Sequence, residues 1–254
     1  MAVVDARSSM STAPESRLLE EVLGWIDSGE LRVPRAARPF VWSAEQRCAL
    51  FDSVENHYPI GNILVWETDE EMSSLPEFAG VRLPDPPQAG SVIYLLDGHQ
   101  RLATLYDGLR RRKRGETDAP SDERQRMYRE LRVDETGSDR YHYRELDQVP
   151  PHFLSMDSVL RTLDFLAFAR GLTEHADLPV DELVEEAEEV AQRFKTYRLP
   201  LVRLRGGDPS QAFDVFHRIN SAGSALSPSE LRDGRRALSD SGDSSRDRSV
   251  RGSQ

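Results

Sequence analysis

Five consecutive residues, Asp97-Gly98-His99-Gln100-Arg101, combine the side chains needed to bind a phosphate group. They follow an apolar run typical of a buried strand and precede an amphipathic helical pattern. Glycine permits a tight turn, and the unpaired amide groups and positive dipole end of the helix can hold a phosphate. Arg101, one turn into the helix, offers a planar guanidinium that can bind two phosphate oxygens at once. The sequence therefore predicts a phosphate site at this junction.

The other side chains of this motif have several possible roles. Asp97 would oppose a bound phosphate unless it holds a magnesium ion, orients a water molecule or pins an arginine, and we favour magnesium or water. His99 and Gln100 can donate hydrogen bonds, and Thr104 lies one turn further along the helix. The alternative is an ordinary turn in which His99 and Arg101 are solvated, because short glycine motifs often occur by chance.

A second segment with related chemistry is Arg38-Pro39-Phe40-Val41-Trp42, which directly precedes a predicted helix. Its arginine can bind a phosphate, and its aromatic rings can stack on a base. Phe40 and Trp42 fit a hydrophobic core equally well, and aromatic residues are found there more often. We therefore treat Arg38 as a candidate ligand and leave the role of the two rings open.

A third segment places Arg218 and Asn220 at the end of a predicted helix, before a loop of small residues. Both side chains can contribute to an anion site. The nearby Ser227-Pro228 pair is also explained as the capped start of another helix. The segment is therefore a candidate only in combination with the other two.

The composition restricts the classes of function. The chain has 254 residues, 38% of them hydrophobic, which is enough to bury a core. Its formal net charge of -11 argues against non-specific coating of DNA or of an anionic membrane, so any DNA contact is local or made through a partner. The single cysteine, Cys48, excludes an internal disulfide. Without a long apolar run or a secretion signal, we expect a cytoplasmic protein that does not engage membranes.

Patterning along the chain predicts its organisation. We expect helices over 16–29, from Ser43 to about Tyr58, over 158–171 and 181–197, and over 211–219. Predicted strands cover 31–33, 60–67, 91–96, the pair 127–133 and 141–146, and 197–204. The resulting division is a disordered leader (1–15), a core (16–149), a helical insertion (150–196), a return to the core (197–232) and a disordered tail (233–254).

Five motifs in order resemble the N-terminal domain of GmrSD-type restriction systems. They are Arg38-Pro39-Phe40-Val41-Trp42, Tyr58-Pro59-Ile60-Gly61, Leu64-Val65-Trp66-Glu67, Asp97-Gly98-His99-Gln100-Arg101-Leu102 and Phe216-His217-Arg218-Ile219-Asn220. The resemblance implies an α+β fold with a ParB/sulfiredoxin-like core, made of a small mixed sheet with flanking helices. It also implies a domain that binds and hydrolyses nucleoside triphosphates in phage defence, senses modified DNA and often precedes an HNH-type nuclease domain.

Carried over residue by residue, the resemblance makes Asp97, Gly98, Gln100 and Arg101 the nucleotide site, with Arg38, Arg218 and Asn220 as contributors. The chain departs from the family at His99, where glutamine is usual, and at Ala37, where glutamine commonly stands. It also shows no nuclease domain after Leu231, so we do not expect this chain to cleave DNA alone.

Three hypotheses remain open. In the leading one, a magnesium-dependent nucleoside triphosphatase, Arg101 and the helix start hold the phosphates, Asp97 with magnesium positions a water molecule and Gln100 orients it. The second is a nucleotide switch without hydrolysis. The third is a module that reads modified DNA through Arg35, Arg38 and the nearby aromatic residues. Whether the chain forms a homo-oligomer is also left open.

Overall fold

The computed structural model describes residues 10–86, 90–110, 125–131 and 140–221. Within these residues the chain forms three β-sheets and six α-helices. The strands are β1 (Ser11–Leu18), β2 (Leu31–Arg32), β3 (Ile63–Thr68), β4 (Glu77–Phe78), β5 (Val81–Arg82), β6 (Val92–Asp97), β7 (Arg126–Glu130), β8 (Tyr141–Arg144), β9 (Phe153–Ser155) and β10 (Arg198–Arg205). The helices are α1 (Leu19–Asp27), α2 (Ala44–Glu55), α3 (His99–Leu109), α5 (Thr162–Leu172), α6 (Val180–Thr196) and α7 (Pro209–Ser221), with a 3-10 helix η2 (Met156–Ser158).

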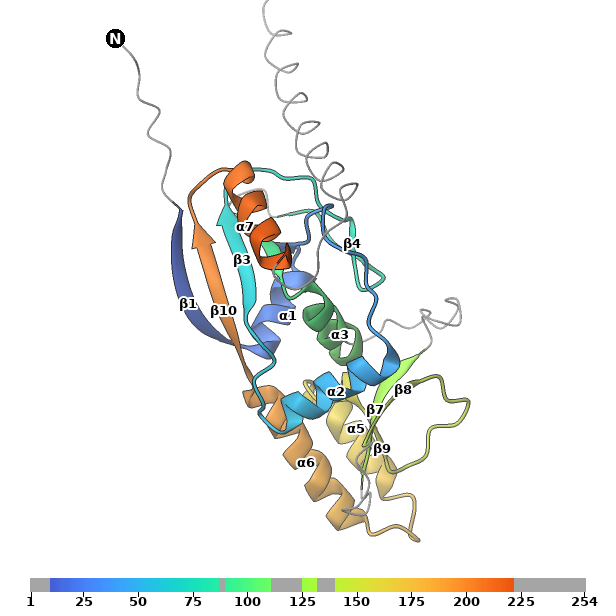
Figure 1. Ribbon diagram of the computed structural model, residues 1–254. Helices are drawn as coiled ribbons and strands as arrows, with labels where there is room; N and C mark the ends of the chain where they lie inside the picture. Colours follow the sequence, from blue (N-terminus) through green and yellow to red (C-terminus); the bar gives the residue numbers. More distant parts are fainter. Residues whose placement is uncertain (1–9, 87–89, 111–124, 132–139, 222–254) are drawn as a thin grey trace, which may run out of the picture.

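The largest sheet is mixed and has the strand order β1-β10-β3-β6-β2. β10 is antiparallel to β1 and parallel to β3, whereas β6 is antiparallel to β3 and parallel to β2. This sheet and α7 lie toward one end of the molecule, and α5, α6 and the smaller sheet formed by β7, β8 and β9 lie toward the other (Figure 1). The α+β class predicted from the sequence is confirmed, and the architecture is compatible with a ParB/sulfiredoxin-like core.

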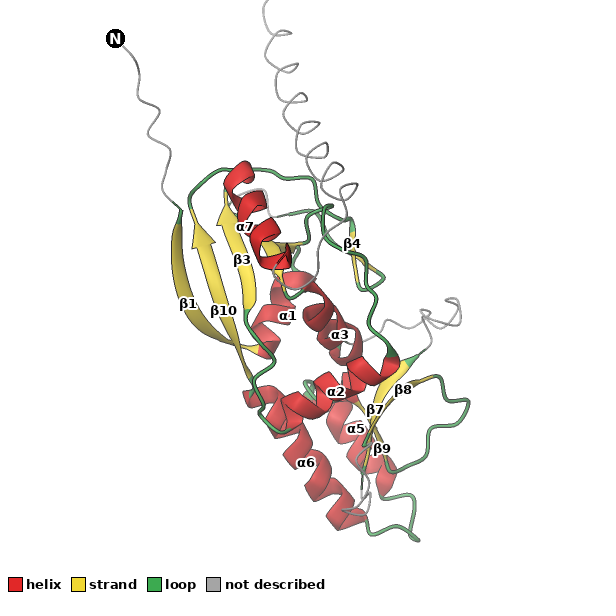
Figure 2. Cartoon of the chain, in the orientation of Figure 1, coloured by secondary structure: helices red, strands yellow, loops and turns green. Residues whose placement is uncertain are grey.

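Strands β3 and β6, in the interior of the sheet, are buried on both faces, as their apolar runs predicted. Ile63 and Val65 of β3 belong to the main core, which also contains residues of α1, α2 and α3. Leu64 and Trp66 alternate with them and belong to a second cluster that includes Phe216 of α7. Side chains of a strand point alternately to its two faces, so α7 covers the face opposite to α1 and α3. Figure 2 shows these helices around the sheet.

The start of α2 also forms as predicted. The Ser43 side chain accepts a hydrogen bond from the Gln46 backbone, and the Gln46 side chain accepts one from the Ser43 backbone, which completes a capping box. The helix ends at Glu55, three residues before the expected end near Tyr58. The segment Arg38–Trp42 is thus the loop that leads directly into a helix with a capped N-terminus.

A smaller antiparallel sheet, with the order β8-β7-β9, packs against α2 through β8 and against α3 and η2 through β7. The predicted strand pair over 127–133 and 141–146 corresponds to β7 and β8. β9 pairs with β7 across the boundary that the sequence placed at residue 150. The division of the chain into a core and a helical insertion stays a prediction, with this strand pairing linking the two parts.

The prediction of a disordered leader over 1–15 is wrong for residues 11–15. Ser11 begins β1, which pairs with β10 through to Leu18, so the first helix begins at Leu19 and not at Ser16. β1 is an edge strand with mostly exposed side chains, held by backbone hydrogen bonds and by ion pairs. Composition cannot reveal such a strand, because it lacks the apolar signal of a core element.

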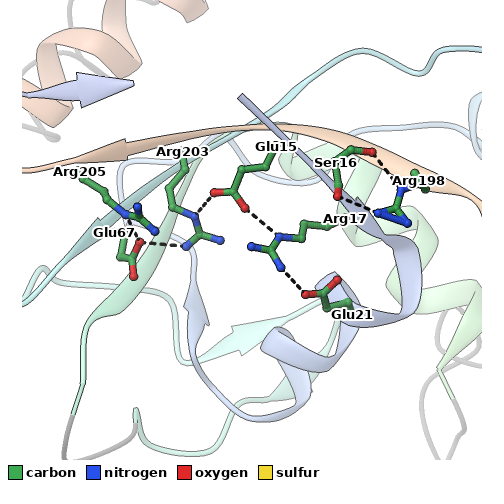
Figure 3. A network of polar contacts seen from close by, with 8 residues as sticks. All are labelled: Glu15, Ser16, Arg17, Glu21, Glu67, Arg198, Arg203 and Arg205. Carbon is green, nitrogen blue, oxygen red and sulfur yellow. Dashed lines mark hydrogen bonds and ion pairs between the residues drawn. The ribbon is translucent and has the colours of Figure 1, made fainter. Parts of the chain in front are cut away.

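Ion pairs fix β1 to its neighbours (Figure 3). Glu15 of β1 binds both Arg17 and the buried Arg203 of β10, and Arg203 also binds Glu67 of β3. The Arg203 guanidinium lies 5.1 Å from the centre of the Trp25 ring. Burial raises the pKa of Glu15, but hydrogen bonds from the two arginines outweigh this effect and hold that pKa below its usual value. Three strands are therefore joined by one charge network.

Several sequence-based predictions concern other parts of the chain. The predicted disordered tail over 233–254 and residues 1–9 of the leader lie outside the described residues. No described helix is long and apolar enough to cross a membrane.

Candidate functional site

The Asp97–Arg101 motif lies where β6 ends and α3 begins, as the sequence predicted. Gly98 adopts a left-handed conformation with φ of +98°, and a Cβ atom there would lie 2.4 Å from Cδ1 of Ile63. Only glycine fits both the backbone and this close approach. The Leu102 amide donates to the Gly98 carbonyl, and Gly98, the N-cap residue, has no side chain with which to cap the helix. The first turn of α3 therefore has amide groups available to a phosphate.

Arg101 is held beside this helix start by two acceptors. Its Nη1 donates to the Ile60 carbonyl over 2.8 Å, and its Nη2 donates to Oδ2 of Asp97 over 3.0 Å. Gly61, with φ of +86°, makes this arrangement possible, because a Cβ atom there would lie 2.5 Å from Arg101 Nη1. The motif Tyr58-Pro59-Ile60-Gly61 thus forms one wall around the guanidinium.

Asp97 performs the third of the roles considered from the sequence, since it pins an arginine. Its side chain is 36% exposed, so the carboxylate also faces solvent. Magnesium commonly uses one or two carboxylates together with phosphate oxygens and water, and a single partly exposed carboxylate beside the candidate phosphate site is compatible with that pattern. Among the described residues there is no group of three or more histidine, cysteine or acidic side chains that could hold a metal ion.

Gln100 and His99 bind the loop Arg38–Trp42. The Gln100 side chain donates from Nε2 to the Pro39 carbonyl and accepts at Oε1 from the Val41 amide, both over 2.8 Å. Nδ1 of His99 lies 3.2 Å from the Arg38 carbonyl, and it carries the proton because a carbonyl can only accept. Burial lowers the pKa of His99 and outweighs the opposing effect of this hydrogen bond, so the ring is neutral at pH 7.

The aromatic residues of this loop pack inward. Phe40 and Trp42 are half-buried against the main core, which favours the core interpretation over a platform for a base. The Phe40 ring also covers Arg47 of α2, whose guanidinium lies 4.3 Å from the ring centres of Phe40 and of Tyr143. Arg47 Nη1 contacts Oδ2 of Asp107 over 3.2 Å. Arg38 is half-buried, and its backbone is brought to the start of α3 by His99.

The remaining candidates are less closely connected to the motif. Thr104 is 2% exposed, and its hydroxyl donates to the Gln100 carbonyl, so it belongs to the packed face of α3. Arg218 is exposed on α7, which packs on β6. The side chain of Asn220 lies outside the described residues. The structure thus joins the first two motifs directly and links the third through the packing of α7.

Sequence reasoning gave no site role to several residues that shape this region. Gly61 and the Ile60 carbonyl position Arg101, and their signal was available in the Tyr58-Pro59-Ile60-Gly61 motif, which was used only for the resemblance. The contact of Arg47 with Tyr143 joins residues far apart in the chain and left no signal in the sequence. A separate cavity of about 450 Å³ lies between α2 and β8, and Cys48 is one of its lining residues.

The fold and the site define a class of protein: an α+β domain in which a glycine turn and a helix start with an adjacent arginine follow an interior strand of the sheet. A family model described as GmrSD restriction endonuclease, N-terminal domain, matches residues 19–235, which is most of the chain. The chain therefore belongs to the family of GmrSD restriction endonuclease N-terminal domains, and the suspected resemblance is confirmed. No curated protein matches the sequence.

Proposed function

We propose that this domain binds and hydrolyses a nucleoside triphosphate as part of a restriction system directed against phage. The observation that supports this most strongly is the start of α3, which has no side-chain cap and has Arg101 fixed beside it. A helix start offers several amide donors and a favourable dipole, and an arginine adds positive charge with a matching geometry. Membership of the GmrSD family supports a role of the domain in restriction.

In this proposal each residue of the motif has a separate role in binding the nucleotide. The first-turn amides of α3 and the guanidinium of Arg101 hold the phosphates, while Arg38 approaches from the neighbouring loop. Asp97 keeps Arg101 in place, and its carboxylate is partly exposed beside the start of α3. That carboxylate would hold magnesium, which neutralises phosphate charge when it is bound. Arg218 and Asn220 of α7 complete the set of proposed ligands, while Thr104 contributes through the packing of α3.

Phosphate release from each common nucleoside triphosphate tests this function directly. The parent and the Asp97→Ala variant are compared in the presence and absence of magnesium. We expect release by the parent with magnesium and a loss of release in the variant. Release that is unchanged in the folded variant would show that the reaction takes place elsewhere.

A second candidate function, a nucleotide switch without hydrolysis, has one observation in its favour. Gln100, the residue expected to orient water, already binds two backbone groups with its amide. In a switch, the nucleotide would only shift the domain between states that do or do not engage a partner. Tight nucleotide binding by the parent without any phosphate release would favour this function over hydrolysis.

DNA is the proposed macromolecular target, reached directly or through a nuclease partner in the cytoplasm. The exposed Arg35 and the neighbouring Arg38 form a local basic turn in a chain of net charge -11. Binding to modified and plain duplexes across a salt series tests direct recognition. A specific reader keeps its preference for the modified duplex as salt rises, whereas binding that is lost equally for both duplexes indicates non-specific contact with the phosphates.

A further inference from the structure

One glutamine side chain of α3, Gln100, makes two hydrogen bonds to the loop Arg38–Trp42, one as donor and one as acceptor. Gln100 Nε2 donates to the Pro39 carbonyl, and Gln100 Oε1 accepts from the Val41 amide. These partners precede Gln100 by 61 and 59 residues in the chain, so the contact is a long-range tertiary one. An amide side chain that matches a backbone donor and acceptor together fixes both the distance and the orientation of the loop.

Other contacts of the loop show why this attachment matters. The side chain of Val41 is 75% exposed, so this part of the loop gains little from burial. His99 supplies a third polar contact, at the Arg38 carbonyl, and Phe40 packs on Arg47. Phe40 and Trp42 pack against the main core, and the polar contacts of Gln100 and His99 hold the backbone before and between these two rings. The backbone of Arg38, at the beginning of this segment, thereby lies next to the first turn of α3.

We propose that Gln100 is a positioning residue that clamps the loop Arg38–Trp42 against α3 and so places Arg38 for the phosphates of a bound nucleotide. This inference rests on the proposed nucleotide site and assigns Gln100 a role different from orienting the attacking water. In the structure both ends of its amide are bound to the loop. Its influence on the nucleotide is therefore indirect and passes through the position of the loop.

Two substitutions separate the two halves of the clamp. Gln100→Ala removes both hydrogen bonds. Gln100→Glu keeps the acceptor for the Val41 amide, but its carboxylate cannot donate to the Pro39 carbonyl and repels it. Gln192→Ala, at an exposed glutamine of α6, is the control for replacing a glutamine in this fold.

The first measurement is hydrogen exchange of the Val41 amide in the full chain without nucleotide. We expect exchange to be about tenfold faster in Gln100→Ala, to change less in Gln100→Glu and to stay unchanged in Gln192→Ala. An unchanged rate at Val41 in a folded Gln100→Ala variant would overturn the clamp. Because no ligand is present, this result is independent of whether the proposed function is correct.

The second measurement is steady-state turnover of the nucleoside triphosphate that the parent hydrolyses best. A displaced loop lowers the fraction of the protein that can bind, so we expect KM to rise about tenfold and kcat to stay within about threefold. A fall in kcat with unchanged KM and unchanged Val41 exchange would instead assign Gln100 to the reacting water and overturn the proposal.

If the parent binds nucleotide without turnover, Kd is measured in place of KM, and the Kd of Gln100→Ala should rise by the same factor. A parent that binds no nucleotide would overturn the proposed function and the role of the clamp in it, while the exchange data would still decide whether the clamp exists.

Discussion

Two arginine–carboxylate pairs in this domain differ in their surroundings. Glu55 and Arg129 have side chains that are 6% and 1% exposed, and they share two hydrogen bonds of 3.0 Å. The side chains of Asp97 and Arg101 are 36% and 18% exposed and share one hydrogen bond, while the Ile60 carbonyl occupies another guanidinium nitrogen. The first pair joins α2 to the small sheet, and the second lies at the start of α3.

The two pairs differ in whether their charged groups remain accessible to water or to a ligand. Tyr141 donates to Glu55, and Glu186 binds Arg129, so the buried pair is enclosed by protein partners. Removing one member of a buried pair leaves an uncompensated charge, whereas an exposed pair can exchange a partner for water or for a ligand at low cost. We therefore expect the buried pair to act in stability, whereas the partly exposed pair fits the proposed role in binding.

The largest expected effect is on the buried pair. Arg129→Ala would leave Glu55 without its guanidinium, and we expect the free energy of unfolding to fall by about 3–5 kcal/mol in urea titrations. Glu189→Ala, which removes a more exposed pair with Arg193 on α6, is the control and should cost less than about 1 kcal/mol. An equal loss in the free energy of unfolding for the two variants would contradict the distinction between the buried pair and the more exposed one.

A substitution at Gly61 tests the exposed pair without touching either charge. Gly61→Ala would place a Cβ atom 2.5 Å from Arg101 Nη1, so the guanidinium has to move. We expect a stability loss of about 1–3 kcal/mol and nucleotide binding weakened about tenfold.

Gly80→Ala is the matched control for this variant. Gly80 also has a positive φ, of +75°, but no heavy atom of the described residues lies within 4 Å of its Cβ position. It should lose stability through backbone strain alone, about 1 kcal/mol, and bind nucleotide like the parent. Parent-like nucleotide binding by Gly61→Ala would contradict the proposed role of Arg101.

Acid should weaken the buried pair in a predictable direction. Burial raises the pKa of Glu55, but hydrogen bonds from Arg129 and Tyr141 outweigh this and hold that pKa below its usual value. Its contribution to stability is therefore present above the unfolded pKa of about 4.3 and is lost as pH falls through the lower folded value. Unfolding measured from pH 6 down to about pH 3 should show this loss. A folded Arg129→Ala variant with the same acid dependence as the parent would contradict it.

The smallest effect is expected at Thr104. Thr104→Val removes a hydroxyl that binds the Gln100 carbonyl within the helix, so we expect a stability change below about 1 kcal/mol. Because the residue is buried in the packed face of α3, nucleotide affinity should stay within about twofold of the parent, as measured by calorimetry. A larger loss of affinity would make Thr104 a direct ligand, as the sequence suggested.

Sequence patterns predicted most of the fold because the central elements carry strong signals. β3 and β6 are continuous apolar runs, and Ser43 with Gln46 forms the capping box that their spacing indicates. β1 was missed because an edge strand held by backbone bonds and ion pairs needs few apolar residues.

For the candidate site, the sequence identified the motif and its place between strand and helix, because both neighbours have clear patterns. It could not show that Gln100 binds Pro39 and Val41, since that contact depends on how distant segments pack. Nor could it show that Gly61 makes room for Arg101, although it did single out the segment that contains this glycine.

The most direct test of the account is the binding of magnesium nucleoside triphosphates by calorimetry to the parent, to Arg101→Ala and to Arg193→Ala. Unfolding curves first establish that both variants are folded. We predict that Arg101→Ala weakens binding by about 10- to 100-fold, because a charge-assisted contact to phosphate is lost, and that Arg193→Ala binds like the parent. Parent-like affinity in folded Arg101→Ala would contradict the placement of a nucleotide site at the start of α3.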